Sequence, residues 1–280
     1  MVPQAKRVPI GEVSDLIRVG EPLPFRVLDE FERLLLNEGH VIANDRQLAL
    51  LVERGAWIDR RLVAEQRRQR AGQGGAPRVS LARTQTLFDR WEKAQWDLDS
   101  VLRRTAKGQA GAADWQAMAA ELITLVDRDA DIALFLAVRQ DDRRFALYPL
   151  AHSLHAAVLA LLAARQAGWP APRQQSVVGA ALSMNVAMLE LQAHMAEQDT
   201  PPTKAQFDVI RGHTQHGVTL LQGAGIDDFA WLRAVAEHHE RADGSGYPRG
   251  LTEVCDEARV LRMADVYMAK ITPRAQRPAL

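Results

Sequence analysis

The spacing of hydrophobic residues changes near residue 80. Before it, short runs in which apolar and polar residues alternate, such as 25–29, are typical of half-buried strands. Further strands are expected over 33–36 and 40–43, with a turn at Asn37-Glu38-Gly39 between them. Residues 45–53 read as a helix ended by Gly55, and 56–58 as a closing strand. Residues 1–65 are therefore predicted to form a small β-rich module of mixed α and β structure.

From Ser80 onward apolar residues recur at helical spacing almost to the end of the chain. The stretch 145–166 is apolar on most faces and is expected to be the central helix. Thr203-Lys204-Ala205-Gln206 has the spacing of a capping box, which predicts a helix start. Other helices are expected over 81–107, 115–126, 132–138, 174–195, 229–241 and from 256 onward. The fold class predicted for 80–280 is a mainly α bundle.

The segment 66–79 is rich in arginine and then in glycine, which is a linker composition. The alternative with a specific function is that its arginines form a nucleic-acid-binding arm. No aromatic residues interleave with them, so a linker between the two parts is favoured.

Composition narrows the class of protein. The chain is 47% hydrophobic and 25% charged with a formal net charge of zero, so neither a nucleic acid polymer nor an anionic membrane is an expected partner. No apolar run reaches the ~20 residues of a membrane helix. Residues 1–18 carry charges throughout, unlike a secretory signal. With Cys255 as the single cysteine, the expected location is the cytoplasm.

The strongest chemical motif is His-His-Glu-Arg-Ala-Asp-Gly-Ser-Gly-Tyr-Pro over 238–248. Adjacent imidazoles are typical metal ligands, and the glycines and proline predict a loop after them. Arg241 and Arg249 flank the loop and could bind phosphate as planar forks. The alternative is a capped helix end followed by an ordinary surface loop with solvated arginines.

Three other segments offer partners for this motif. His152 lies early in the expected central helix, and His213 is followed four residues later by Gly217. Asp265 sits in the middle of an apolar helix, where an unpaired carboxylate is costly. It is expected to meet a cation, with an ion pair to Arg259 or Arg262 as the alternative.

These residues together resemble the HD-GYP family, bacterial phosphodiesterases of the HD superfamily that hydrolyse cyclic di-GMP. The resemblance covers about 148–272 and is strongest over 238–251, which includes the Gly246-Tyr247-Pro248 loop. It implies an HD-type helical bundle and a cluster of two or three metal ions. The implied metal ligands are His152, His213, His238, His239 and Asp265. In the family this loop is linked to diguanylate cyclase (GGDEF) domains, which implies a signalling partner.

One segment departs from the family pattern. Met184 and Asn185 stand where the family has its His-Asp pair, and Met188 lies in the same altered segment. A thioether is a soft ligand, and a neutral amide cannot bridge two cations as a carboxylate does. We therefore expect at most one divalent transition metal ion (zinc, iron or manganese), held by His213, His238 and His239, or none. His152 and Asp265 would be the remaining ligands of the family's other metal position.

The leading hypothesis is a degenerate HD-GYP domain in cyclic di-GMP signalling that binds nucleotide or a protein partner without efficient catalysis. One alternative is an active phosphodiesterase with a single metal ion, in which Arg241 or Arg249 stabilises charge. Another is a scaffold, with a homodimer as one form, that binds neither nucleotide nor metal. The residues alone leave catalysis undecided.

Overall fold

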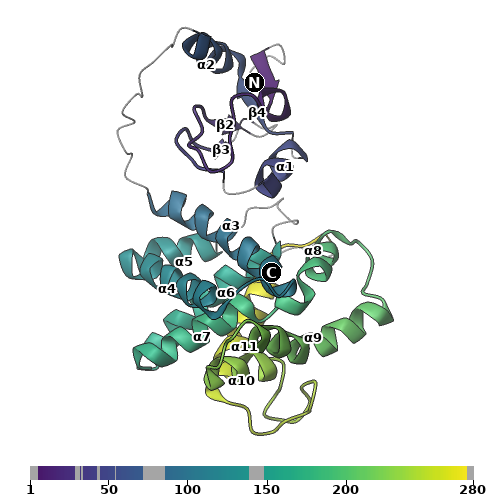
Figure 1. Cartoon of the computed structure of the whole chain (residues 1–280). Helices are drawn as coiled ribbons and strands as arrows, with labels where there is room; N and C mark the ends of the chain where they lie inside the picture. Colours follow the sequence, from purple (N-terminus) through teal and green to yellow (C-terminus); the bar gives the residue numbers. More distant parts are fainter. Residues whose placement is uncertain are drawn as a thin grey trace. The chain divides into compact units, whose positions relative to one another are not determined.

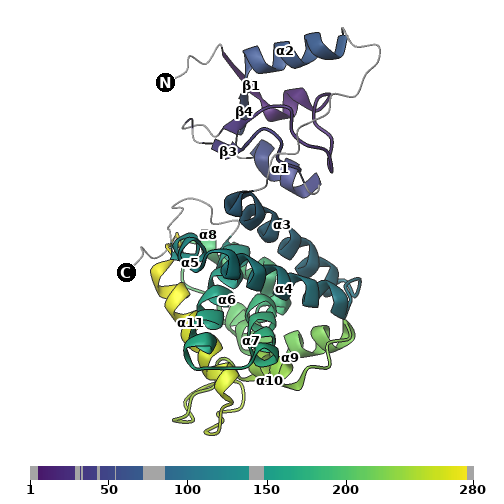
Figure 2. The ribbon, with the colours of Figure 1, turned by 90° about the vertical axis from the view of Figure 1, so that its left-hand side faces the viewer.

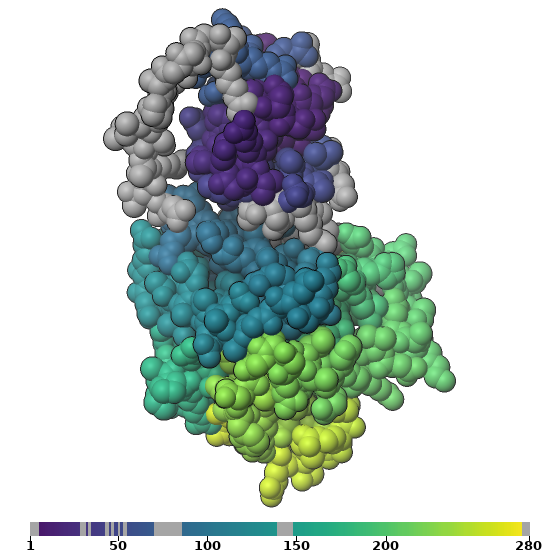
Figure 3. All heavy atoms as spheres, viewed as in Figure 1, coloured from purple at the N-terminus to yellow at the C-terminus, as the bar shows by residue number. Residues whose placement is uncertain are grey.

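The computed structural model describes residues 6–28, 32, 34–42, 45–53, 55–71, 86–138 and 148–275. The chain divides into two compact units, Met1–Asp89 and Arg90–Leu280, and each is described by itself. Figure 1 and Figure 2 show the ribbon in two views, and Figure 3 shows all heavy atoms as spheres.

The N-terminal unit contains an antiparallel sheet in the order β1-β4-β2-β3. Its strands are β1 (Arg7–Pro9), β2 (Val27–Leu28), β3 (Leu34–Leu36) and β4 (Trp57–Asp59). The sheet is accompanied by η2 (Ile10–Val13), α1 (Asp45–Glu53) and α2 (Arg60–Ala71). The predicted strand at 40–43 is reduced to an isolated bridge between Val41 and Pro22, and residue 43 lies outside the described residues.

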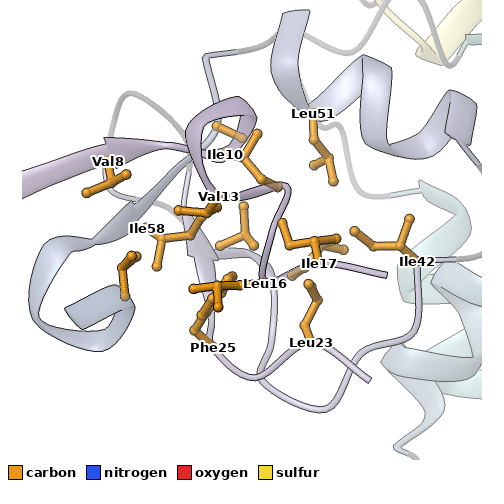
Figure 4. Close-up of a cluster of buried hydrophobic side chains, with 14 residues drawn as sticks. Val8, Ile10, Val13, Leu16, Ile17, Leu23, Phe25, Ile42, Leu51 and Ile58 are labelled. Atoms are coloured by element: carbon orange, nitrogen blue, oxygen red, sulfur yellow. The ribbon is translucent and has the colours of Figure 1, made fainter. Parts of the chain in front are cut away.

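A hydrophobic core holds this unit together. Its side chains come from the sheet, the helices and the loops, and they point toward one another in Figure 4. Phe25, Val27 and Ile58 are at most 1% exposed. Strand β1 was missed by the sequence prediction because its three residues are too few to show alternation, yet it pairs with β4 along its whole length.

Helix α2 overlaps the predicted linker. The arginine-rich residues 66–71 continue this helix, because arginine, glutamine and alanine are good helix formers. The glycine-rich remainder of 66–79 lies outside the described residues. The boundary between the two predicted domains therefore stays a prediction.

The second unit is a helical bundle, which confirms the predicted mainly α fold. Its helices are α3 (Leu87–Ala106), α4 (Ala112–Arg128), α5 (Ala130–Val138), α6 (Tyr148–Gln166), α7 (Ala171–Ser183), η4 (Val186–Met188), α8 (Leu189–Glu197), α9 (Lys204–Gly223), α10 (Phe229–Glu237) and α11 (Asp256–Ile271). Helix α6 is central and packs against α5, α7 and α11. Leu154, Ala157 and Leu161 on it have no exposed surface, as its apolar sequence predicts.

The capping box at the start of α9 is confirmed. The Gln206 backbone N–H donates to Thr203 Oγ1 at 3.3 Å, and the Thr203 N–H donates to Gln206 Oε1 at 2.7 Å. Both bonds satisfy donors that the first helical turn leaves without partners.

The helix predicted over 174–195 is interrupted. Helix α7 ends at Ser183, and Asn185 has non-helical backbone angles before η4 and α8 continue the chain. The break falls on Met184 and Asn185, the pair that departs from the family pattern. Among described residues, one stretch, Ala171–Glu197, passes a length and composition test for crossing a membrane, and 72% of its apolar window is buried inside the protein.

Gly179 on α7 lies against the indole of Trp231, and an added Cβ would sit 2.3 Å from that ring. Gly179→Ala is therefore expected to lower the free energy of unfolding by about 3 kcal/mol or more. Gly212→Ala is the matched control, because nothing lies within 4 Å of a Cβ at that exposed helical position. It should raise stability by about 0.5–1 kcal/mol. Urea unfolding followed by circular dichroism measures both; equal midpoints would contradict this packing.

Candidate metal centre

Three histidines gather where α9 meets the end of α10. His213 projects from α9, while His238 and His239 follow directly after α10. One ligand atom from each lies within 4.8 Å of the others. The predicted helix over 229–241 ends earlier, at Glu237, because the Glu240 N–H turns back to the Glu237 carbonyl at 2.8 Å. Both histidines therefore lie in a turn instead of on a helix.

The hydrogen bonds of two imidazoles define which nitrogen can bind a cation. His213 Nδ1 donates to the Ile210 carbonyl at 2.6 Å, and His238 Nδ1 donates to the Val235 carbonyl at 2.8 Å. Each neutral ring then has a lone pair on Nε2, and these two atoms lie 3.4 Å apart. Metal-binding histidines commonly donate their other nitrogen to a carbonyl in this way.

Burial keeps the three rings neutral. It is the main cause that lowers the pKa of His213 to about 4 and that of His239 to about 2, and it also lowers the pKa of His238. His238 lowers the pKa of both other rings further, because two like charges would lie close together. Neutral lone pairs are therefore present at ordinary pH, which is what a divalent transition metal requires.

The other implied ligands are arranged differently. His152 Nε2 lies 2.8 Å from Asp265 Oδ1, so these two groups bond to each other. Burial alone would raise the pKa of Asp265, but the hydrogen bond with His152 and the nearby imidazoles hold it below its ordinary value. The alternative ion pair to Arg259 or Arg262 does not form: Arg259 bonds to Asp256 at 3.4 Å, and Arg262 has no hydrogen-bond or ion-pair partner among the described residues.

Asn185 of the altered pair lines one cavity with members of both groups. Met184 has no exposed surface, and Asn185 is 4% exposed with an Oδ1 atom that has no partner among the described residues. Asn185 lines a cavity of about 150 Å³ together with His152, His239 and Asp265. Met188 lines the same cavity. A neutral amide thus lines the same cavity as the carboxylate of Asp265, at the position where the family resemblance implies a second carboxylate.

The donor set fits one metal ion. His213, His238 and His239 each offer one ligand atom within 4.8 Å of the others, and three histidines with one open position suit a tetrahedral zinc-type site. His152 and Asp265 lie outside this set of three and bond to each other. When bound, such an ion would polarise a water molecule or a phosphate oxygen.

Two buried glutamates shape the loop that follows the histidines. Glu240 accepts the backbone N–H groups of Arg249 and Leu251 at 2.7 and 2.9 Å. Glu237 accepts the Cys255 N–H at 3.0 Å and the Arg233 side chain at 2.9 Å. The role of Glu237 was missed by the sequence prediction, because a glutamate at a helix end carries no distinctive signal.

The Gly246-Tyr247-Pro248 segment packs directly on this backbone. A Cβ at Gly246 would lie 2.4 Å from the Arg241 nitrogen and 2.5 Å from Glu240 Cα, so glycine is required by the close approach. Tyr247 stacks on His239 with ring centroids 4.6 Å apart, and its N–H donates to the His239 carbonyl at 3.3 Å. The loop therefore closes over the histidine cluster.

The two arginines predicted to bind substrate lie in different surroundings. Arg249 approaches Glu237 at 3.5 Å and serves the loop through its backbone N–H. Arg241 pairs with Asp243 at 3.2 Å and lines a separate groove beside α11. The structure does not bring the two guanidinium groups into one phosphate site with the histidines.

Comparison with known proteins agrees with this architecture. The family described as HD domain matches residues 139–280, which is half of the chain. The chain belongs to the HD domain family. Members of this family depend on metal, and the histidine cluster of this HD domain is a candidate site for it.

Curated relatives are similar to parts of this HD domain. Cyclic di-GMP phosphodiesterase PA4108 of Pseudomonas aeruginosa is 28% identical over 129 residues, 45% of this chain and 31% of that protein. Cyclic di-GMP phosphodiesterase response regulator RpfG of Xanthomonas campestris is 37% identical over 81 residues, 28% of this chain and 21% of that protein. The chain spans less than a third of the length of either relative.

A solved structure shares the fold. Bd1817, an HDG"Y"P protein from Bdellovibrio bacteriovorus, has a TM-score of 0.57 at 14% identity, covering 97% of this chain and 89% of that one. With the named relatives, it confirms the resemblance of this HD domain to the HD-GYP family.

Acid should destabilise the metal-free protein. An unfolded histidine takes up a proton below about pH 6.5, whereas burial holds the folded pKa of His213 at about 4. Protons therefore favour the unfolded chain between these values, and His213 alone should remove up to about 3 kcal/mol as pH falls from 6.5 to 4.

Urea unfolding in EDTA across this range measures the effect. His213→Gln is the comparison. The slope of its unfolding free energy against pH should be smaller, by the amount that corresponds to about one bound proton. Parallel pH profiles for the two proteins would refute the assignment.

Proposed function

We propose that this HD domain acts in cyclic di-GMP signalling without efficient hydrolysis. The observation that carries the proposal is Asn185, whose amide oxygen has no partner among the described residues and which lines one cavity with His239 and the bonded pair of His152 and Asp265. Two metal ions about 3.5–4 Å apart repel each other strongly unless a shared carboxylate compensates. A neutral amide provides no such compensation.

The size of the cavity supports the same proposal. The space bounded by Asn185, His239 and Asp265 is about 150 Å³. Sites that enclose drug-sized ligands have roughly 300–1,000 Å³. A whole cyclic dinucleotide exceeds the smaller volume, so this cavity could not enclose it.

The loop at 246–248 would then serve recognition instead of catalysis. Its backbone is held by Glu240, and Tyr247 is anchored on His239, which gives a partner a rigid surface. By the family resemblance, the partner would be a diguanylate cyclase (GGDEF) or another signalling protein. A cytoplasmic location fits the single cysteine, Cys255.

A second candidate is an active phosphodiesterase with one metal ion. The three neutral imidazoles favour it, since three histidines and a water form a workable catalytic zinc site. Arg241 pairs with Asp243 and Arg249 approaches Glu237, so the two guanidinium groups do not form one phosphate site with the histidines, which counts against this candidate.

We expect the full chain to show no turnover of cyclic di-GMP on the order of 1 s⁻¹ after loading with zinc, manganese or iron(II). It should bind at most one ion per chain, because His152 and Asp265 are engaged with each other. Chromatography of the products and elemental analysis after dialysis measure both quantities. Ordinary enzyme turnover would overturn the proposal, and two ions per chain would refute the account of the metal site.

Asn185→Asp should restore a partner for a second cation. The new carboxylate would face the cavity beside Asp265 and raise the affinity for manganese or iron by about tenfold or more. Gln192→Glu is the matched control, because Gln192 also has an unpartnered oxygen in this cavity but comes from α8.

Metal titration of the two variants shows whether the gain in affinity depends on the position of residue 185 or only on the added negative charge. Asn185→Asp alone should gain affinity if this position bridges two ions. An equal gain in Gln192→Glu would show that any added charge suffices and would remove the bridging argument.

A further inference from the structure

A groove of about 720 Å³ lies outside the histidine cluster, between the turn Glu240–Asp243 and the outer face of α11. In Figure 1 and Figure 2 the loop between α10 and α11 extends from one end of the helical unit. The groove is within the size range of small-molecule sites. Its distinctive lining residues are Arg241, Arg259, Arg262, Met263, Tyr267 and Lys270.

The groove is positively charged within a chain of zero net charge. Four cationic side chains face two carboxylates, Glu240 and Asp243. The Glu240 carboxylate is buried and already accepts two backbone N–H groups. Asp243 accepts the N–H and the hydroxyl of Ser245 at 2.9 and 2.6 Å. Arg241 pairs with Asp243 at 3.2 Å and Arg259 pairs with Asp256 at 3.4 Å, whereas Arg262 forms no ion pair with a described residue.

Arg262 is the cation that points most clearly to a ligand. It is half-buried and forms no hydrogen bond or ion pair with any described residue. None of its nitrogens is buried without a partner, so its five N–H donors remain accessible to an anion that enters the groove. Exposed pairs such as Arg259 with Asp256 contribute little and can exchange partners readily.

Apolar side chains accompany these charges. Met263 and Tyr267 are one helical turn apart on α11 and are 47% and 48% exposed. Arg262 and Lys270 flank them on the same helix. An exposed aromatic ring beside a guanidinium fork suits a ligand that carries both a flat base and a phosphate.

A nucleotide fits this surface better than a protein does. A stable protein interface buries about 800 Å² on each partner and centres on several buried apolar anchors. Here the exposed apolar anchors of α11 are two side chains within a concave groove. A dinucleotide would use the concavity, the ring and the cations together.

We propose that this groove binds a phosphodiester-linked purine dinucleotide, with Arg262 holding a phosphate and Tyr267 stacking on a base. The choice of ligand class rests on the proposed role in cyclic di-GMP signalling, while the site is distinct from the histidine cluster. Binding here requires no metal ion. It also requires no entry into the 150 Å³ cavity.

Calorimetry of the full chain in EDTA tests the site with two probes, cyclic di-GMP and the linear dinucleotide GpG. We expect binding in the micromolar range that weakens as salt increases. Tighter binding of the cyclic probe would indicate that the natural ligand is the free signalling nucleotide. Equal binding of the two probes would indicate that the groove also accepts the ends of linear RNA. Both results would support the groove as a phosphodiester site.

Three variants locate the site. Arg262→Gln and Tyr267→Ala should each weaken binding by about tenfold, which corresponds to about 1.4 kcal/mol. Lys204→Gln removes the same charge from the exposed start of α9, outside the groove, and should leave binding unchanged within about twofold. Thermal unfolding verifies that each variant is folded, and Lys270→Gln replaces any that is not.

Three outcomes would overturn the proposal. The first is that neither probe binds at millimolar concentration. This result would refute the groove proposal alone, because the proposed function is tested separately by hydrolysis and metal content. The second is binding that EDTA abolishes and Arg262→Gln does not change, which would place the ligand on the histidines. The third is binding of an acidic peptide such as hexaglutamate in preference to both nucleotides.

Discussion

Two buried carboxylates, Glu237 and Glu240, determine the shape of the functional end of this molecule. Glu237 is the last residue of α10 and Glu240 lies in the turn after it, and both carboxylates accept backbone N–H groups from the loop that follows. A buried charge with no such donors would be strongly unfavourable, so the loop and the glutamates stabilise one another. Through them the histidine pair, Tyr247 and the start of α11 keep fixed positions.

Much of the helical unit could be predicted from the sequence, because helical periodicity and caps are local signals. The capping box at Thr203 and the apolar central helix α6 are confirmed. The break at Asn185 could not be predicted, since tertiary packing decides whether an apolar run stays straight. The role of Glu237 depends on backbone donors far along the chain, and composition misled where the arginine-rich residues 66–71 proved helical.

The candidate site combines two solutions to the problem of buried polar groups. On one side, His213 and His238 each donate to a carbonyl and leave lone pairs that face each other. On the other side, His152 and Asp265 satisfy one another. The sequence motifs and the family resemblance brought all four residues into consideration, but only their hydrogen-bond partners in the structure distinguish the two groups.

The hydrogen bond between His152 and Asp265 has a consequence for the protein in the cell. A buried carboxylate in such a bundle ordinarily needs a cation from outside, and the fold then depends on supply of that ion. Here His152 on α6 bonds to the carboxylate of Asp265, so a residue of the chain takes the place of the external cation. The fold therefore satisfies the carboxylate of Asp265 without an ion supplied by the cell.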